Sequence, residues 1–381
     1  MSTEPARAPV TEVARLFLRL GATAFGGPAA HIAMMHDEVV RRRRWMSEQR
    51  FLDLLGATNL IPGPNSTEMA IHVGFARARW TGLVVAGVAF IAPAMAIVLV
   101  LAWAYVRYGR TPAGEGLLYG IEPVVIAIIV QALLALGPTA VKRSPLLAVG
   151  GAAALGLYLA GVNELAVLFG GGLVVMVARR APSGSHAFIP PMLVAFPLAV
   201  VAAARTSVEL DRLFLLFLKF GAIVFGSGYV LFAFIHGDLV TRYGWLTEQQ
   251  LVDALAVGQF TPGPVFTTAT FIGYLLAGVP GALVATLGIF LPSFIFVAAI
   301  HPIVHLMRRS NWTADLLDGV IVAALGLMAG VTWQLGQRAI MDAATLVIAI
   351  AAAVALLRFR VNSAVVIAGG AALGLVIHLL G

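Results

Sequence analysis

The sequence LFLRLG at residues 16–21 returns as LFLKFG at residues 216–221, and Pro62-Gly63-Pro64 returns as Pro262-Gly263-Pro264. Between these points, the stretch WMSEQ at residues 45–49 is matched by WLTEQ at residues 245–249. After a shift of one residue, further positions coincide: Gly74, Gly82, Pro93, Gly120, Gly137 and Asn163 fall on Gly273, Gly281, Pro292, Gly319, Gly336 and Asn362. The chain therefore contains two copies of one pattern.

The composition indicates a membrane protein. Of the 381 residues 60% are hydrophobic and only 11% are charged, whereas a soluble domain carries about 25% charged residues. Segments this apolar are predicted to be helical, because open strand edges cannot face lipid. We interpret the net charge of +7 as loop arginines and lysines that orient the chain, not as a nucleic-acid surface. A duplication in such a chain is typical of transporters, with the site between the copies.

Each copy shows the same run of apolar segments. They lie at about residues 13–35, 51–76, 80–106, 117–138, 146–161 and 165–178, and again at about 212–235, 250–276, 279–300, 315–335, 340–357 and 361–380. We predict an N-terminal repeat over residues 1–187, an apolar linker over 188–208 and a C-terminal inverted repeat over 209–381. Since a helix needs about 20 residues to span a bilayer, we expect an all-α polytopic protein with roughly 10–13 membrane segments.

Two segments in each copy are interrupted. The first breaks at the glycines after Phe25 and Phe225, and the second at the two Pro-Gly-Pro motifs. Proline lacks the amide hydrogen and clashes with the preceding turn, so Pro62, Pro64, Pro262 and Pro264 are predicted helix breaks. Each half-segment is too short to span alone, which leaves a broken helix or a re-entrant hairpin. The positive-inside rule favours topologies in which Pro-Gly-Pro is re-entrant, with most of the 25 arginines and lysines on one side. In each topology considered, the second copy is inverted.

Arg19 and Lys219 are the first candidate site residues. They occupy equivalent positions inside apolar segments, where a cation costs about 2.5–3.5 kcal/mol on insertion scales. Because this cost is incurred at both equivalent positions, we predict that the two cations converge on a negatively charged group. The alternative is that both side chains extend to a nearby interface, as long basic side chains do.

The breaks supply the other candidates. A helix that starts after Pro-Gly-Pro presents free amides and the positive end of its dipole, hydroxyl and amide side chains add donors, and glycine permits close approach. The predicted substrate-binding residues are therefore Arg19, Lys219, Gly26, Gly27, Gly63, Asn65, Ser66, Thr67, Gly226, Ser227, Gly263 and Thr267.

A proton relay is the third prediction. Glu68 and His72 are one helical turn apart and can share a face, and a carboxylate beside an imidazole within a membrane suits proton transfer. His31, just beyond the first break, is a further candidate. Glu68 could instead cap its half-helix, since Thr268 stands at the equivalent place. Glu122 is interpreted as a structural acid near the start of its segment.

Several functional classes are excluded by missing residues. The chain has no cysteine, which excludes disulfides and thiolate chemistry. It has neither a phosphate-binding Gly-x-x-x-x-Gly-Lys loop nor a His-Glu-x-x-His motif, and no Gly-x-Ser-x-Gly nucleophile elbow. We therefore expect no enzyme, no cofactor, no metal site and no nucleic-acid partner.

The stretches from Phe25 to His31 and from Trp45 to Phe51, with Pro62-Gly63-Pro64 and their echoes in the second half, resemble the chromate ion transporter family in its long form with two homologous halves. The resemblance implies a multi-pass secondary transporter in the bacterial or archaeal inner membrane that exports chromate, with sulfate as a similar oxyanion. Membrane lipid is an expected partner, and a homodimer is left open. The rival interpretations are a transporter or channel for another ion or an organic acid, and a membrane-embedded enzyme.

Overall fold

The computed structural model describes residues 9–25, 27–142, 144–180, 208–225, 230–301 and 311–380, and these ranges contain helices and no strand. Five helices are long and apolar enough to cross a membrane. They are Asn65–Tyr108, Pro112–Val141, Val265–Ile300, Ala314–Ala339 and Ser363–Leu380. This confirms the all-α polytopic class. The linker predicted at residues 188–208 lies outside the described residues apart from Val208, and the domain boundaries stay a prediction.

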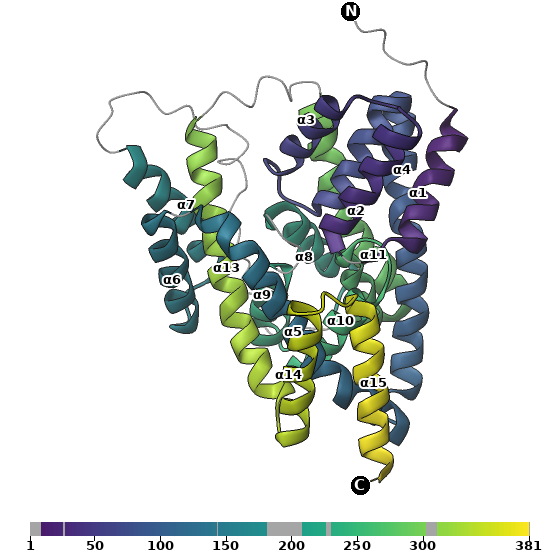
Figure 1. Cartoon of the computed structure of the whole chain (residues 1–381), viewed down its shortest axis with the longest axis vertical. Helices are drawn as coiled ribbons and strands as arrows, with labels where there is room; N and C mark the ends of the chain where they lie inside the picture. The colour runs from purple at the N-terminus through teal and green to yellow at the C-terminus, as the bar shows by residue number, and fades with distance from the viewer. Residues whose placement is uncertain are drawn as a thin grey trace, which may run out of the picture.

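The helices of the two copies follow the predicted apolar segments (Figure 1). The first copy contains α1 (Val10–Thr23), α2 (Gly27–His36), the π-helix η1 (Asp37–Arg42), α3 (Glu48–Thr58), α4 (Asn65–Tyr108), α5 (Pro112–Val141), α6 (Pro145–Leu159) and α7 (Glu164–Arg180). The second contains α8 (Leu210–Ile223), α9 (Leu231–Ile235), the π-helix η4 (His236–Arg242), α10 (Glu248–Phe260), the 3₁₀-helix η5 (Val265–Thr267), α11 (Thr268–Ile300), α13 (Asn311–Ala339), α14 (Ala343–Leu357) and α15 (Ser363–Leu380).

The first interrupted segment of the first copy is a hairpin. Helix α1 ends at Thr23 and is followed by Ala24, which has extended backbone (φ −83°, ψ 106°), and Gly27 starts α2 with a positive φ of 74°. Arg43, just after η1, pairs with Glu12 in the first turn of α1 at 2.9 Å. The beginning and the end of this segment therefore lie next to each other, so the segment folds back on itself.

The Pro-Gly-Pro segment of the first copy is also a hairpin. The guanidinium of Arg77 lies 5.3 Å from the ring centre of Trp45, which precedes α3. The chain then turns sharply inside α4, where Arg79 has a φ of 56°. A Cβ on Gly74 would overlap the carbonyl oxygen of Gly82, so the two parts of α4 fold back on each other. The Pro-Gly-Pro segment of the first copy is thus folded as a helical hairpin, and its placement in the membrane stays a prediction.

The second copy runs in the opposite direction to the first. It has the same reversal, at Ala277 and Gly278 within α11. The ring of His301, directly after α11, lies 4.4 Å from that of Phe75, before the reversal in α4. At the other end, the rings of Tyr105 and Phe271 are 5.1 Å apart. The end of one long helix thus meets the beginning of its counterpart, which confirms the inverted repeat.

The two copies interlock through glycine contacts. Helix α5 packs along α15 of the other copy, and α13 packs along α7 in the reciprocal way. A Cβ on Gly120 would overlap the carbonyl oxygen of Gly370, and one on Gly319 would lie 2.8 Å from that of Gly171. Small residues allow this backbone approach in membrane helices. Each copy therefore completes part of its packing with a helix of the other, and Figure 1 shows α13 beside α6 and α7.

Candidate functional site

The breaks of one copy bond directly to those of the other. The amide of Gly63 donates to the carbonyl of Val224 at 2.7 Å, and the amide of Gly263 donates to the carbonyl of Ala24 at 2.9 Å. Ala24 and Val224 are equivalent residues that directly follow α1 and α8. A reciprocal exchange of this kind is the signature of two-fold symmetry. The structure therefore brings each Pro-Gly-Pro motif against the first break of the opposite copy.

Both motif glycines sit where a side chain does not fit. Gly63 has a φ of 136° and Gly263 a φ of 86°, values that favour glycine. A Cβ on Gly63 would meet the carboxyl of Glu68 and lie 2.8 Å from the hydroxyl oxygen of Ser293. A Cβ on Gly263 would lie 2.8 Å from the Cβ of Ala94, the residue equivalent to Ser293. Equivalent positions therefore surround the two glycines, but the neighbours of Gly63 are polar whereas Ala94 beside Gly263 is apolar.

The first Pro-Gly-Pro break holds buried polar groups that are not fully bonded. Ser66, Thr67 and Glu68 are all buried. The hydroxyl of Ser293 donates to Glu68 Oε1 at 3.5 Å, whereas Glu68 Oε2 and Thr67 Oγ1 are buried without a hydrogen-bond partner among the described residues. Asn65 lies nearer the surface, and its side-chain amide donates to Asn59 at 2.8 Å. Such groups ordinarily have hydrogen-bond partners, so these two atoms are the least satisfied polar groups of the first Pro-Gly-Pro break among the described residues.

The second Pro-Gly-Pro break is more complete. The hydroxyl of Thr267 is buried and donates to the carbonyl of Pro264 at 2.8 Å, and that of Thr268 donates to Val265 at 2.8 Å. The predicted substrate contact of Thr267 stays a prediction. Gly27 faces open space, because a Cβ there would meet no atom within 4 Å. Gly26, Gly226 and Ser227 lie outside the described residues.

In the structure, the predicted proton carriers His31, His72 and Glu68 each contact a different partner. The imidazole of His31 is buried with Nε2 3.0 Å from the carbonyl oxygen of Ala24, the same oxygen that accepts from Gly263. His72 pairs with His301, their Nδ1 atoms 2.9 Å apart, while Glu68 bonds to Ser293. No repeat signal marks His301, because Ala102 stands at its equivalent in the first copy, so the comparison of the two copies missed it.

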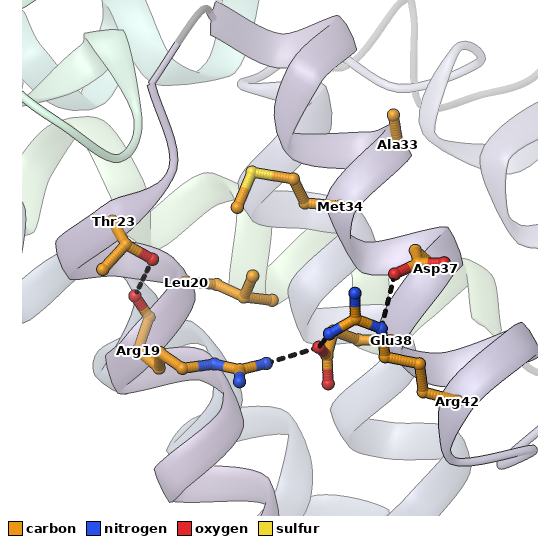
Figure 2. Close-up of a pocket in the computed structure, with 8 residues that line it drawn as sticks. All are labelled: Arg19, Leu20, Thr23, Ala33, Met34, Asp37, Glu38 and Arg42. Atoms are coloured by element: carbon orange, nitrogen blue, oxygen red, sulfur yellow. Dashed lines mark hydrogen bonds and ion pairs between the residues drawn. The ribbon is translucent and has the colours of Figure 1, made fainter.

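Arg19 and Lys219 each bind a carboxylate of their own copy. Arg19 lies 2.6 Å from Glu38, and Lys219 lies 2.5 Å from Asp238. Arg19 also lines a surface pocket of about 490 Å³ between α1, α2 and η1 (Figure 2). The lining residues are Arg19, Leu20, Thr23, Ala33, Met34, Asp37, Glu38 and Arg42. The convergence of Arg19 and Lys219 on one anion stays a prediction, since each cation already has an acidic partner.

Glu38 is the centre of the first of these charge groups. It accepts from Arg19 and also from Arg42 and Arg43, both at 3.1 Å. Glu38 lies in η1, outside the helices long enough to span a membrane. Partial burial works to raise the pKa of its carboxyl, but the hydrogen bonds from Arg19 and Arg43 outweigh it and hold the pKa below the ordinary value of 4.5. Glu38 is therefore an anion at neutral pH.

The described residues contain no group of three or more histidine, aspartate or glutamate side chains arranged to hold a metal ion. The helix breaks instead offer main-chain amides at a helix start, hydroxyls and one buried carboxyl, whereas Arg19 and Lys219 are each paired within their own copy. Helix starts of this kind are suited to anions.

Comparisons with known proteins assign the family. The chromate transporter model matches residues 11–176 and 212–375, one range in each copy. A chromate transport protein of Cupriavidus metallidurans is 35% identical over 95% of this chain and 92% of its own length. A probable chromate transport protein of Synechococcus elongatus is 32% identical over 90% of this chain and 88% of its own length. No solved structure matches significantly. The chain therefore belongs to the chromate transporter family, whose members are multi-pass membrane transporters and not enzymes.

Proposed function

We propose that this protein exports chromate across the cytoplasmic membrane of a bacterium or archaeon, and that the oxyanion binds where the helix breaks of the two copies meet. The family supports a chromate transport function. The observation that carries the placement is the reciprocal pair of hydrogen bonds from Gly63 to Val224 and from Gly263 to Ala24. The two bonds join each Pro-Gly-Pro break to the first break of the opposite copy, and transporters built from inverted repeats bind their substrates between the copies.

The first turn of α4 supplies the donors for the oxyanion. The amides of Thr67 and Glu68 bond back to the carbonyl of Pro64 at 2.8 and 3.0 Å. The amides of Asn65 and Ser66 have no main-chain acceptor in the described part of the chain. Together with the hydroxyl of Thr67, they form a cluster of donors at the positive end of a helix. A tetrahedral dianion such as chromate, or sulfate as a competitor, suits such a cluster.

Glu68 couples the oxyanion to a proton. Its carboxyl is fully buried beside these donors, where an ionised form would repel a dianion. When it is protonated, the carboxyl turns from a repelling charge into a hydrogen-bond donor. Oxyanion and proton therefore bind together, and alternating access moves both by rocking one copy against the other. The pair carries one net negative charge, so an inside-negative membrane potential drives its export.

A matched pair of threonine variants tests the placement. Thr67→Val removes an unbonded hydroxyl, whereas Thr267→Val removes one that already bonds to its own backbone. We expect Thr67→Val to lower chromate flux in proteoliposomes by roughly tenfold, the equivalent of about 1.4 kcal/mol, and Thr267→Val to lower it less. Equal fluxes in wild type and Thr67→Val would remove the first Pro-Gly-Pro break from the site.

A coupled cation other than the proton is the second candidate, because an acid, Glu68, lies at the repeat interface while Arg19 and Lys219 are paired. Chromate flux is measured under an imposed pH gradient, under an imposed sodium gradient and under voltage alone, with sulfate as competitor. Drive by the pH gradient that Glu68→Gln abolishes supports proton coupling. Drive by sodium would replace it with cation coupling. Chromate accumulation in intact cells, lower with the protein than without, tests export.

A further inference from the structure

A second group of buried acids lies where the end of α4 meets α5 and α10. The hydroxyl of Tyr105 donates to Asp253 Oδ2 at 2.6 Å. The side-chain amide of Gln249 donates to Glu122 Oε1. Gln249 and Asp253 are one turn apart on α10, which packs against α5, so the two carboxyls are neighbours and interact electrostatically.

Both carboxyls are removed from solvent, and one is incompletely bonded. Asp253 is 1% exposed and Glu122 is 4% exposed. Asp253 Oδ1 is buried without a hydrogen-bond partner among the described residues. A buried carboxylate oxygen usually has a partner, so this atom marks a place for a ligand that the protein itself does not supply.

The pair of acids has no basic partner in the described part of the chain, where none of the salt bridges includes Glu122 or Asp253. The basic and acidic side chains toward this end of the packed helices are Arg107 on α4, Arg110 just after it, Glu115 on α5, Glu248 on α10, Arg338 on α13 and His378 on α15, and the tyrosines are Tyr108, Tyr119 and Tyr274. The other charged groups on elements packed against α10 are Asp315 and Asp318 on α13 and His236, Asp238 and Arg242 on η4. Arg338 forms an ion pair with Glu248 at 2.8 Å. The positive charge of Arg110 interacts electrostatically with the hydroxyl group of Tyr105. Two adjacent buried carboxyls without a cation cannot both remain ionised at an acceptable cost.

We propose that Glu122 and Asp253 together hold one exchangeable proton, in a site separate from Glu68. Tyr105 fixes one oxygen of Asp253, Gln249 fixes one oxygen of Glu122, and Asp253 Oδ1 is the free position for the proton. Gln249, which bonds to Glu122, is itself exposed, so the proton would enter from this side of the pair. The site does not depend on where the oxyanion binds.

The first copy lacks this arrangement. Asp53, the equivalent of Asp253, is half-buried on α3 and accepts from the side-chain amide of Gln49 at 3.0 Å. In the second copy, Gln249 donates to Glu122 of the other copy instead. The proposed proton site therefore has no counterpart at Asp53, the equivalent position of the first copy. Asp53 provides a matched control.

Infrared difference spectra of the purified full-length protein, titrated with acid and base in lipid, test the proposal. The carbonyl band of protonated carboxyl groups reports bound protons directly. We expect the double variant Asp253→Asn with Glu122→Gln to lose one protonated carboxyl at neutral pH, and Asp53→Asn to lose none. An unchanged neutral-pH band in the double variant would overturn the proposal. Glu68→Gln, measured in parallel, identifies the part of the band that belongs to the other site.

The single variants keep the proposal testable if the double variant does not fold. In Asp253→Asn and in Glu122→Gln, the remaining acid has lost its charged neighbour. Its protonated band is then expected to disappear at a lower pH than in wild type, while Asp53→Asn titrates as wild type does. Identical titrations in wild type and both single variants would show that the two carboxyls share no proton.

Discussion

The imidazoles of His72 and His301 bond to each other across the two copies, with Nδ1 atoms 2.9 Å apart and 229 positions between them in the chain. Such a bond requires one Nδ1 to carry a proton and the other to accept it, so the two tautomers are set as a pair. Phe75 packs on His301 beside the reversal of α4. The pair therefore fastens the two inverted copies where their long helices meet.

A double-mutant cycle measures how much the hydrogen bond between His72 and His301 contributes to stability. We expect His72→Leu and His301→Leu to be coupled by about 0.5–1.5 kcal/mol in thermal or denaturant unfolding, the usual net value of one hydrogen bond. The control cycle combines His301→Leu with His36→Leu, a histidine that lies 3.5 Å from Glu48 instead. Additive effects of the His72 and His301 variants would mean that their bond contributes nothing to stability.

Gly63 is the glycine at which an added methyl should do most harm. Its positive φ costs another residue about 1–3 kcal/mol, and a Cβ would press on Glu68 and Ser293. Gly63→Ala should therefore reduce chromate flux severely and lower the unfolding temperature. Gly137→Ala serves as the control, because Gly137 also repeats but a Cβ there would meet no atom within 4 Å. Equal behaviour of the two variants in flux and melting would contradict the close packing of this break.

The Arg19–Glu38 pair distinguishes a substrate-binding cation from a structural one. If Arg19 contacts the oxyanion, Arg19→Gln abolishes chromate flux with the protein still in the membrane, and Glu38→Gln, which frees Arg19, changes the apparent affinity. If the ion pair holds α1 to η1, both variants lose flux alike and the exchange Arg19→Glu with Glu38→Arg restores it. We expect the first pattern. Unchanged flux in Arg19→Gln removes Arg19 from the mechanism.

Glu38 also predicts a dependence of stability on pH. A carboxyl whose folded-state pKa is depressed adds stability above its unfolded pKa of 4.5, and this stability is lost as the pH falls through the folded-state value. The difference in melting temperature between wild type and Glu38→Gln should therefore be constant from about pH 8 to pH 5.5. It should shrink below about pH 4.5. A difference that instead grows on acidification would mean that the arginines do not hold the carboxylate.

The interlocked helices predict a matched pair of glycine effects. Gly120→Leu and Gly319→Leu insert a side chain where the backbone of the other copy lies, and overpacking costs about 1–3 kcal/mol or more. Both variants should lower the yield of monodisperse protein in size-exclusion chromatography. Gly156→Leu on α6 is the control, since that glycine faces no neighbour within 4 Å. Full recovery of Gly120→Leu would argue against the α5–α15 contact.

Local features of the fold could be predicted from the sequence. Proline and glycine act on their own turn, so Pro62-Gly63-Pro64 and its repeat indicated the breaks directly, and charge bias indicated the inversion. Contacts between distant segments could not be predicted in this way. The sequence of an apolar segment does not indicate which other segment it packs against. The contact between Gly120 and Gly370 is therefore seen only in the structure.

The same limit applies to the candidate site. The repeat drew attention to Arg19 but not to Glu38 as its partner, because that contact depends on how the hairpin folds back. Glu122 was interpreted as an acid near the start of a helix. In the structure it lies well inside α5 and accepts from Gln249 of the other copy. A residue whose role depends on a distant helix is recognised only after that helix is placed.

The packing of α5 against α15 also governs when the protein can finish folding. Helix α5 leaves the ribosome well before α15, because α6 to α14 are synthesised between them. At a synthesis rate of about 5–20 residues per second, α5 must wait on the order of ten seconds or more for its partner. During that interval its glycine-lined face borders lipid or other proteins of the insertion machinery. The first copy of this transporter thus completes its packing only after α15 of the second copy has been synthesised.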